Sequence, residues 1–341
     1  MARMRMGEAG GMPVDEVTIR SQAGAEARVM AWGAVLRDLV VPLPGGGRQR
    51  VVLGLNSLDD YIAHSPHFGA IAGRFANRVA EGRFIVDGRA CQLDRNQAGR
   101  HALHGGSAAF GKRVWSIGAH NERSVTLVVV SPNGDGGYPG TLTASCTYRL
   151  DEPGTLTVEL TAITDAPTIV NLAQHSYFNL DGSPTVIDHD LQVAADFVTP
   201  VDADLIPTGE IVAVAGTAFD FRAARPIRFP GSDGGPFLYD HNFCLTSPRP
   251  APGSLRHAAT LHSRRNGLSL MVHTTEPGLQ VYDGHKIAVP VPGLGGTVYG
   301  ASAGLCLEAQ RWPDSPNRPH FTDAVLRPGE IYRQVTEFRF T

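Results

Sequence analysis

Apolar and polar residues alternate with a period of two along much of the chain, which is the pattern of strands with one buried face. The clearest case is 155–162, where Leu156, Val158, Leu160 and Ala162 share one face and polar residues occupy the other. Gly82–Gly88 ends in Asp-Gly, a hairpin signal, with a return strand expected at 91–93. The same reasoning predicts strands at 34–41, 51–53, 125–130, 142–149, 191–193, 268–273, 279–282, 304–308 and 332–340.

Helical periodicity is scarce. Only 57–62 predicts a short helical turn, with Ser57 as its cap and Asp60 three residues on. Closely spaced short strands joined by glycine and proline turns predict an all-β fold, a large antiparallel β-sandwich. No linker interrupts the pattern, although 229–253 is rich in loop residues. We therefore expect one domain over 13–341, preceded by a disordered tail at 1–12.

Charge and cysteine content argue against several classes of protein. The net charge of −3 over 341 residues gives no basic stripe for a nucleic acid. No apolar stretch reaches the length of about 18 residues that a membrane span needs. The four cysteines are far apart and form no CxxC pair, so neither a metal site nor a disulfide framework is predicted. Reduced thiols in a cytoplasmic protein fit this usage better.

The segment 171–180, NLAQHSYFNL, concentrates polar side chains in what is predicted to be the continuation of a strand from 168–170. So many hydrogen-bonding groups need partners if they are buried. Either they satisfy one another in the core or they line a wet pocket. We favour the pocket, with His175 as a proton donor in it and Asn171, Gln174 and Asn179 as support.

Four further segments carry polar groups that a plain sandwich does not need: 73–79, 103–106, 239–243 and 305–315. Singly, each has an ordinary explanation: a structural histidine, a surface ion pair, a turn-capping aspartate or a solvated glutamate at a strand end. His64 and His67 are interpreted as non-ligands. Together, the segments offer acids, bases and amides suited to sugar hydroxyls, with Trp312 suited to the apolar face of a sugar. Acid–base chemistry on a polyol is the resulting hypothesis.

These segments also resemble the aldose 1-epimerase (galactose mutarotase) family over nearly the whole chain. The residues that carry the resemblance are VVLGLNSLDDY (51–61), FGAIAGRFANRVAEGRF (68–84), LHGG (103–106), NLAQHSYFNL (171–180), DHNF (240–243), PGLQVYDG (277–284) and LEAQRWPDSPN (307–317). The resemblance implies the large β-sandwich of the galactose mutarotase type (a supersandwich), no cofactor, and a monosaccharide substrate, with galactose or glucose expected. We expect a monomer or a homodimer.

The resemblance also implies roles for individual residues. Glu308 matches the catalytic base, His175 the catalytic acid, and His104 a second histidine at the anomeric centre. Sugar-binding positions are matched by Arg74, Asn77, Asp240 and Gln280. The chain departs from the family pattern at His101 and at Ala173-Gln174, which could alter sugar preference.

The mechanism that follows is ring opening by proton transfer. Glu308 takes the anomeric proton while protonated His175 donates to the ring oxygen; the C1–C2 bond rotates and the ring closes again.

Three alternatives remain open: a glycoside hydrolase using Asp240 and Glu308, a non-catalytic sugar-binding module, and a hexose-6-phosphate epimerase that binds phosphate through Arg74 and Arg78. The loops Pro230–Gly235 and Pro290–Gly300 are expected to distinguish sugars.

Overall fold

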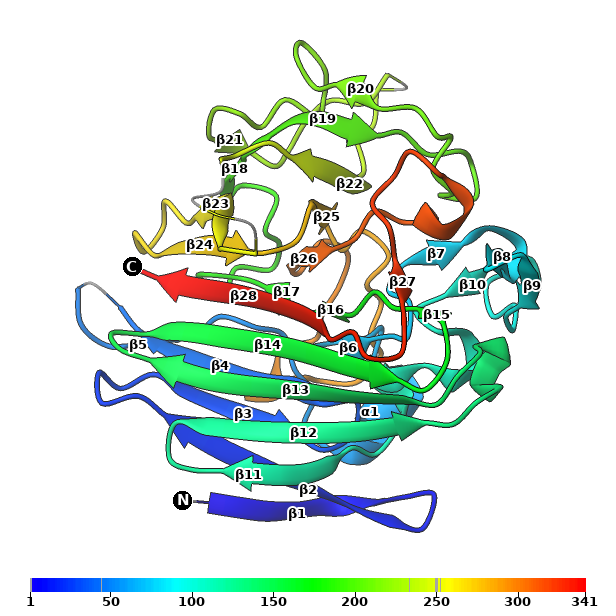
Figure 1. Cartoon of the computed structure of the whole chain (residues 1–341). Coiled ribbons are helices and arrows are strands. Elements are labelled where there is room, and N and C mark those ends of the chain that lie inside the picture. Colours follow the sequence, from blue (N-terminus) through cyan, green and yellow to red (C-terminus); the bar gives the residue numbers. More distant parts are fainter. Residues whose placement is uncertain (1, 44, 233, 249–250, 252) are drawn as a thin grey trace.

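Antiparallel strands build almost the whole fold (Figure 1). The structure, a computed structural model, describes residues 2–43, 45–232, 234–248, 251 and 253–341. Within these residues the one α-helix is α1 (Leu58–His64), which begins after the predicted cap: the Ser57 hydroxyl accepts the Asp60 N–H at 3.1 Å. None of the helices in this described part is long and apolar enough to cross a membrane.

The largest sheet has nine strands and spans the molecule. In spatial order they are β11 (Ser116–His120), β12 (Ser124–Ser131), β13 (Leu142–Asp151), β14 (Thr155–Thr164), β28 (Tyr332–Phe340), β24 (Ser269–Thr274), β23 (Arg256–His262), β18 (Asp190–Val193) and β21 (Arg225–Pro226). Leu156, Val158, Leu160 and Ala162 of β14 are all buried, which confirms the predicted alternation.

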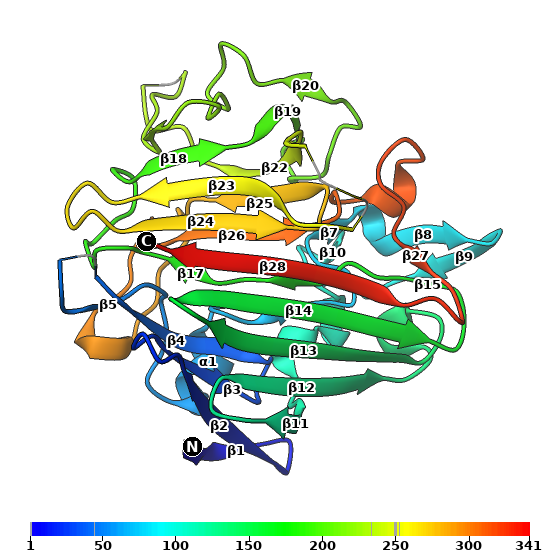
Figure 2. The same cartoon turned by 60° about the vertical axis from the view of Figure 1, so that its left-hand side comes forward.

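Two smaller sheets lie behind the nine-stranded sheet (Figure 2). One has the order β17 (Tyr177–Phe178), β26 (Leu305–Gln310), β25 (Gly278–Tyr282), β22 (Asp240–Leu245), β19 (Ala195–Thr199) and β20 (Val212–Ala213). The other has the order β1 (Ala2–Ala9), β2 (Met12–Arg20), β3 (Glu26–Met30), β4 (Val35–Pro42) and β5 (Arg48–Arg50). Buried side chains of all three sheets share one apolar core, as a β-sandwich requires.

Four two-stranded ribbons complete the fold. They pair β6 (Ile71–Ala72) with β16 (Ala173–Gln174), β7 (Arg78–Val79) with β10 (Ala102–Leu103), β8 (Arg83–Val86) with β9 (Arg89–Gln92), and β15 (Thr168–Ile169) with β27 (Val325–Leu326). The β8–β9 ribbon is the hairpin predicted from Asp87-Gly88.

The expected disordered tail is wrong for the described residues 2–12. Strand β1 pairs with β2 from Ala2 opposite Thr18 to Ala9 opposite Met12. Arg3 and Arg5 both bind the Asp15 carboxylate, at 2.7 and 2.6 Å. The charged residues Arg3 and Arg5 therefore lie on the polar face of an edge hairpin.

The predicted continuation of strand 168–170 through 171–180 is also wrong. The chain there forms three short strands, β15, β16 and β17, and each pairs with a different partner: β27, β6 and β26. Val51–Leu53, predicted as a strand, contributes only an isolated bridge between Val52 and Phe178. The breaks matter because His175 lies between two of these strands, free of a regular ladder.

Candidate active site

Three histidines, two carboxylates and two tyrosines converge on a pocket of about 220 Å³ at the end of β26, which we call the histidine pocket. Its lining residues are Pro66, His67, Asn77, Arg78, Leu103, His104, His175, Tyr177, Asp240, Tyr282, Lys286 and Glu308. Five of the seven residues predicted for the site therefore line one cavity: Glu308, His175, His104, Asn77 and Asp240.

Glu308 and His175 lie next to each other in the lining of the histidine pocket. Glu308 is the fourth residue of β26 and is only 2% exposed; its Oε1 lies 3.6 Å from His175 Nε2. Its other oxygen, Oε2, is buried with no hydrogen-bond partner among the described residues. A buried oxygen without a donor is available to accept a proton or hydrogen bond from a ligand.

Burial controls the protonation of this pair. Burial and the negative charge of Asp240 raise the pKa of Glu308 well above its ordinary value. Burial and the neighbouring His67 lower the pKa of His175 to about 3. Both shifts favour the uncharged forms, as expected for ionisable groups removed from water. In the empty pocket, His175 is therefore neutral at neutral pH.

His104 has a fixed tautomer. Its Nδ1 accepts the backbone N–H of Asn77 at 3.1 Å, so in the neutral ring the proton is on Nε2. Burial, with smaller effects of His67 and His175, lowers the pKa of His104 well below its ordinary value. His104 is thus a neutral hydrogen-bond donor, the form needed to stabilise a carbonyl oxygen that gains negative charge.

The first of the two glycines after His104 allows a close contact between backbone segments. A Cβ at Gly105, where φ is +98°, would lie 2.0 Å from the Gly73 carbonyl oxygen. The close backbone approach allowed by glycine is thus to another segment of the protein and not to a ligand. His104, His67 and Asn77 themselves have left-handed backbones, with φ of 51°, 71° and 63°. Such strained residues often cluster at functional sites.

Asp240 and Arg78 form the polar wall opposite the histidines. Asp240 Oδ1 accepts from Gln280 Nε2 at 2.7 Å, and Asp240 Oδ2 lies 3.6 Å from an Arg78 terminal nitrogen. Arg78 also donates from Nε to Gln97 Oε1 at 2.9 Å. Gln280 lies behind Asp240 and is not among the lining residues, so the structure places it as a support for that carboxylate. Asn77 Oδ1 accepts the Arg78 backbone N–H at 2.9 Å.

Arg74 does not line the histidine pocket, which corrects its prediction as a sugar-binding residue. The residue is 0% exposed, and its guanidinium is directed to the 131–140 loop, where it donates to Ser131, Pro132, Pro139 and Gly140. A buried arginine that satisfies several backbone carbonyls has a structural function. Arg78, four residues on in the same motif, occupies the place expected of Arg74.

Other expected sugar contacts also lie elsewhere. The Trp312 indole donates to the Pro277 carbonyl at 3.2 Å and packs against Phe321, outside the lining of the histidine pocket. The 290–300 loop lines a separate hollow, with Leu294, Val298 and Tyr299. The described residues of 230–235 do not line the histidine pocket either; residue 233 is outside the described part.

Six lining residues were not assigned to the site by the sequence analysis: Pro66, His67, Leu103, Tyr177, Tyr282 and Lys286. The His67 ring lies 4.8 Å from the His104 ring and 5.6 Å from the His175 ring. Burial and Lys112 lower the pKa of His67 to about 4. The available signal was the polar 64–67 segment immediately before the 68–84 motif, but it was tested only as a possible metal site.

The amides of the 171–180 segment are support, as predicted. The Asn171 side chain donates to Ala76 and Arg311 carbonyls, and the Asn179 side chain donates to Ser183 and Ala303 carbonyls. Gln174 bonds to Ser176 at 2.6 Å. These amides fix the backbone around His175 and make no hydrogen bond to its ring.

One group in this region has metal-ligand chemistry. Donor atoms of His175, Cys306 and Glu308 all lie within 4.8 Å of one another. A nitrogen, a sulfur and a carboxylate oxygen would suit zinc. No metal was predicted from the sequence.

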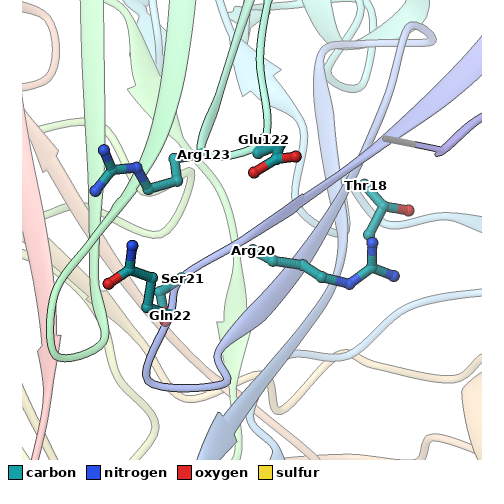
Figure 3. A pocket seen from close by; sticks show the side chains of 6 residues that line it. All are labelled: Thr18, Arg20, Ser21, Gln22, Glu122 and Arg123. Carbon is teal, nitrogen blue, oxygen red and sulfur yellow. The ribbon is translucent and has the colours of Figure 1, made fainter.

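A second hollow, of about 370 Å³, lies between the end of β2 and the turn joining β11 to β12 (Figure 3). It is lined by Thr18, Arg20, Ser21, Gln22, Glu122 and Arg123, and Arg20 is paired with Glu26. None of the predicted site residues is in this set.

Comparison with known proteins agrees with the fold. The family model described as aldose 1-epimerase matches residues 15–339. Mouse galactose mutarotase is 41% identical over 336 residues, covering 97% of this chain and 95% of the mouse protein. Aldose 1-epimerase of Escherichia coli K12 is 39% identical, covering 97% and 96% of the two chains.

Solved structures give the same result. An aldose epimerase homologue from C. elegans superposes with a TM-score of 0.89 at 32% identity, covering 96% of this chain and 98% of that one. Galactose 1-epimerase from Lactobacillus acidophilus gives a TM-score of 0.83 at 28% identity, covering 100% and 98%. The chain described here belongs to the aldose 1-epimerase family.

Proposed function

We propose that this protein interconverts the α and β anomers of a free aldose, with Glu308 and His175 exchanging the protons. The observation that carries the proposal is the pair itself. The buried Glu308 carboxylate places Oε1 3.6 Å from His175 Nε2, and its Oε2 has no hydrogen-bond partner among the described residues. Family membership supports the same activity, because its named relatives are mutarotases and aldose 1-epimerases.

Ring opening needs one proton removed and one added. Glu308 takes the proton of the C1 hydroxyl, His175 as imidazolium gives a proton to the ring oxygen, and the C1–O5 bond breaks to leave an aldehyde. Rotation about C1–C2 presents the other face of the carbonyl. The same two transfers then run in reverse and close the ring with inverted configuration at C1.

The pair holds one proton throughout this cycle. The reactive form has the proton on His175 and Glu308 ionised, whereas the neutral pair is favoured without substrate; after opening, Glu308 is protonated and His175 is neutral. Burial favours the uncharged arrangement, as the pKa shifts of both groups indicate. The site therefore favours the proton distribution that accompanies the open-chain aldehyde, which lowers the free energy of the intermediate.

The surrounding side chains bind and polarise the sugar. His104 donates from Nε2 to the C1 oxygen as it becomes a carbonyl. Arg78 and Asp240 offer donors and acceptors for ring hydroxyls, and Asn77 and Gln280 hold them in place. Galactose and glucose are the first substrates to test. The four cysteines are free thiols in the described structure, which supports the expectation of a cytoplasmic protein.

The test is polarimetry of freshly dissolved α-anomers of galactose, glucose, xylose and arabinose. We expect accelerated equilibration of at least one sugar. Parallel reactions with an aryl glycoside and with a hexose 6-phosphate address the alternatives. Release of the aryl group would indicate a hydrolase, a preference for the phosphate would indicate a hexose-6-phosphate epimerase, and binding without acceleration would indicate a sugar-binding module.

A further inference from the structure

The turn that follows β25 forms part of the open end of the histidine pocket. Within the sheet, Gln280 of β25 lies opposite Glu308, and Tyr282 ends the strand. Lys286, four residues further on, is exposed and lines the pocket together with Tyr282. Glu308 is only 2% exposed. The histidine pocket therefore has a buried end, which holds the proton-exchanging pair, and a solvent-facing rim, which holds Lys286.

The backbone that carries Lys286 is held in place. The Tyr282 hydroxyl accepts the Lys286 N–H at 3.1 Å. Asp283 is buried, and its Oδ1 accepts from the His285 ring Nδ1 at 2.6 Å, while its Oδ2 accepts the Tyr239 N–H at 3.1 Å. These bonds tie the turn to the chain just before β22. A long, exposed side chain thus extends from a fixed position at the rim of the pocket.

Lys286 differs from the other long basic side chain of the lining. Arg78 has an acidic partner, Asp240, at 3.6 Å. The Lys286 ammonium forms no ion pair with a carboxylate of the residues that the structure describes. An ammonium has three hydrogen-bond donors and no acceptor, so its natural partner is an anionic oxygen. A neutral sugar leaves this charge to solvent, whereas a ligand with one negative group at the rim would pair with it.

We propose that the histidine pocket accepts aldoses with a carboxylate at C6, the hexuronates, and that Lys286 is the specificity-determining residue that binds the carboxylate. The proposal rests on the proposed function, because C1 of the same sugar has to meet Glu308 and His175 at the buried end. The other end of the carbon chain, C6, then lies toward the rim. One ammonium balances one carboxylate, whereas a phosphate carries about two negative charges and calls for more than one cation. A hexuronate therefore fits this rim better than a hexose 6-phosphate.

Polarimetry of fresh α-galacturonate and α-galactose tests the proposal through the ratio of their kcat/KM values. In Lys286→Met we expect this ratio to fall by about fivefold, the effect of an exposed ion pair of about 1 kcal/mol. Lys286→Arg should keep the wild-type ratio. The control Arg89→Met, which removes an exposed positive charge from β9, should also keep it. Added salt should lower the ratio in wild type and leave it unchanged in Lys286→Met, because salt screens an exposed pair.

A second measurement reads binding without catalysis. Lys112 and Lys286 are the two lysines of the chain, so acetylation of amines followed by mass spectrometry follows each one separately. Lys112 lines a different hollow and is the internal reference. Saturating galacturonate should slow acetylation of Lys286 at least about threefold, by engaging its ammonium, and should leave Lys112 unchanged.

The proposal is wrong if wild type accelerates galactose and not galacturonate. It is also wrong if Lys286→Met lowers both kcat/KM values equally, which a purely structural role would do. A higher kcat/KM for galactose 6-phosphate than for galacturonate would overturn it as well, because a single ammonium would then not be what selects the ligand. If wild type accelerates no aldose, the proposed function fails; protection of Lys286 by galacturonate would then retain the uronate site, and absence of protection would remove it too.

Discussion

At the scale of single residues, burial of ionisable groups separates this site from an ordinary strand end. A solvent-exposed glutamate at this position of β26 would be ionised at neutral pH, with an ordinary pKa. Glu308 is instead enclosed, its pKa is raised, and one of its oxygens has no partner among the described residues. Such an arrangement destabilises the folded protein and is retained where function needs it.

This argument predicts that Glu308→Gln stabilises the protein at high pH. Between the ordinary glutamate pKa of 4.5 and the raised folded value, the folded state holds a proton that the unfolded chain has lost, so stability falls as pH rises. The amide of the variant does not titrate and has no such loss. The melting temperature of the variant should match wild type near pH 4 and exceed it at pH 8, by on the order of 2 °C for each kcal/mol regained. A difference that is independent of pH would contradict the assigned burial effect. The lowered histidine pKa values affect both proteins and cancel in the comparison.

At the scale of elements, the 73–79 segment separates two arginines that look equivalent in sequence. Arg74 is directed into the 131–140 loop, whereas Arg78, at the start of β7, is directed to Asp240 and the histidine pocket. Three residues outside any named strand, Phe75, Ala76 and the left-handed Asn77, separate the two arginines. One arginine is therefore part of the fold and the other part of the site.

Matched substitutions should separate the two roles. Arg74→Met leaves several buried carbonyls without donors, so we expect the free energy of unfolding to fall by about 3 kcal/mol with an unchanged KM in the folded fraction. Arg78→Met should raise KM by about tenfold or more, the loss of a charged hydrogen bond to a hydroxyl, with a smaller effect on stability. Denaturant titration and polarimetry measure the two quantities. A higher KM for Arg74→Met with normal stability would reverse the assignment.

Period-two alternation located most long strands because it depends on local burial alone. It located β14 and the β8–β9 hairpin. His175 was proposed as a proton donor from its polar segment, whereas the expected roles of Glu308 and His104 came from the family resemblance. Alternation could not show that 171–180 breaks into short strands, because the partners β27, β6 and β26 lie far away in sequence. The direction of Arg74 and the place of His67 depend on similarly distant contacts. The β1 hairpin could not be predicted from local pattern, because its arginines Arg3 and Arg5 pair with Asp15 on the neighbouring strand.

At the scale of the whole molecule, the sandwich gathers the site from segments spread over more than two hundred residues. The 67–78 region, the 103–104 turn, the 175–177 region and strands β22, β25 and β26 all reach one pocket. Residues on different strands can hold a fixed separation because the sheets share a single core. The segment with His175 is tied down by side-chain amides that donate to carbonyls of other segments. The molecule thus provides a rigid frame that holds proton donor and acceptor side by side, 3.6 Å apart, in the lining of the histidine pocket.

The central claim is that Glu308 and His175 exchange protons with an anomeric centre, and Glu308→Gln tests it most directly. Polarimetry with a fresh α-anomer of the preferred sugar should show a kcat reduced by about 10²- to 10⁴-fold, the contribution of one positioned proton transfer. Sugar binding measured by calorimetry should be largely retained, because the amide keeps the shape of the side chain. Glu122→Gln, an exposed position far from the histidine pocket, serves as the control and should equal wild type. Near-normal mutarotation by Glu308→Gln would contradict the account.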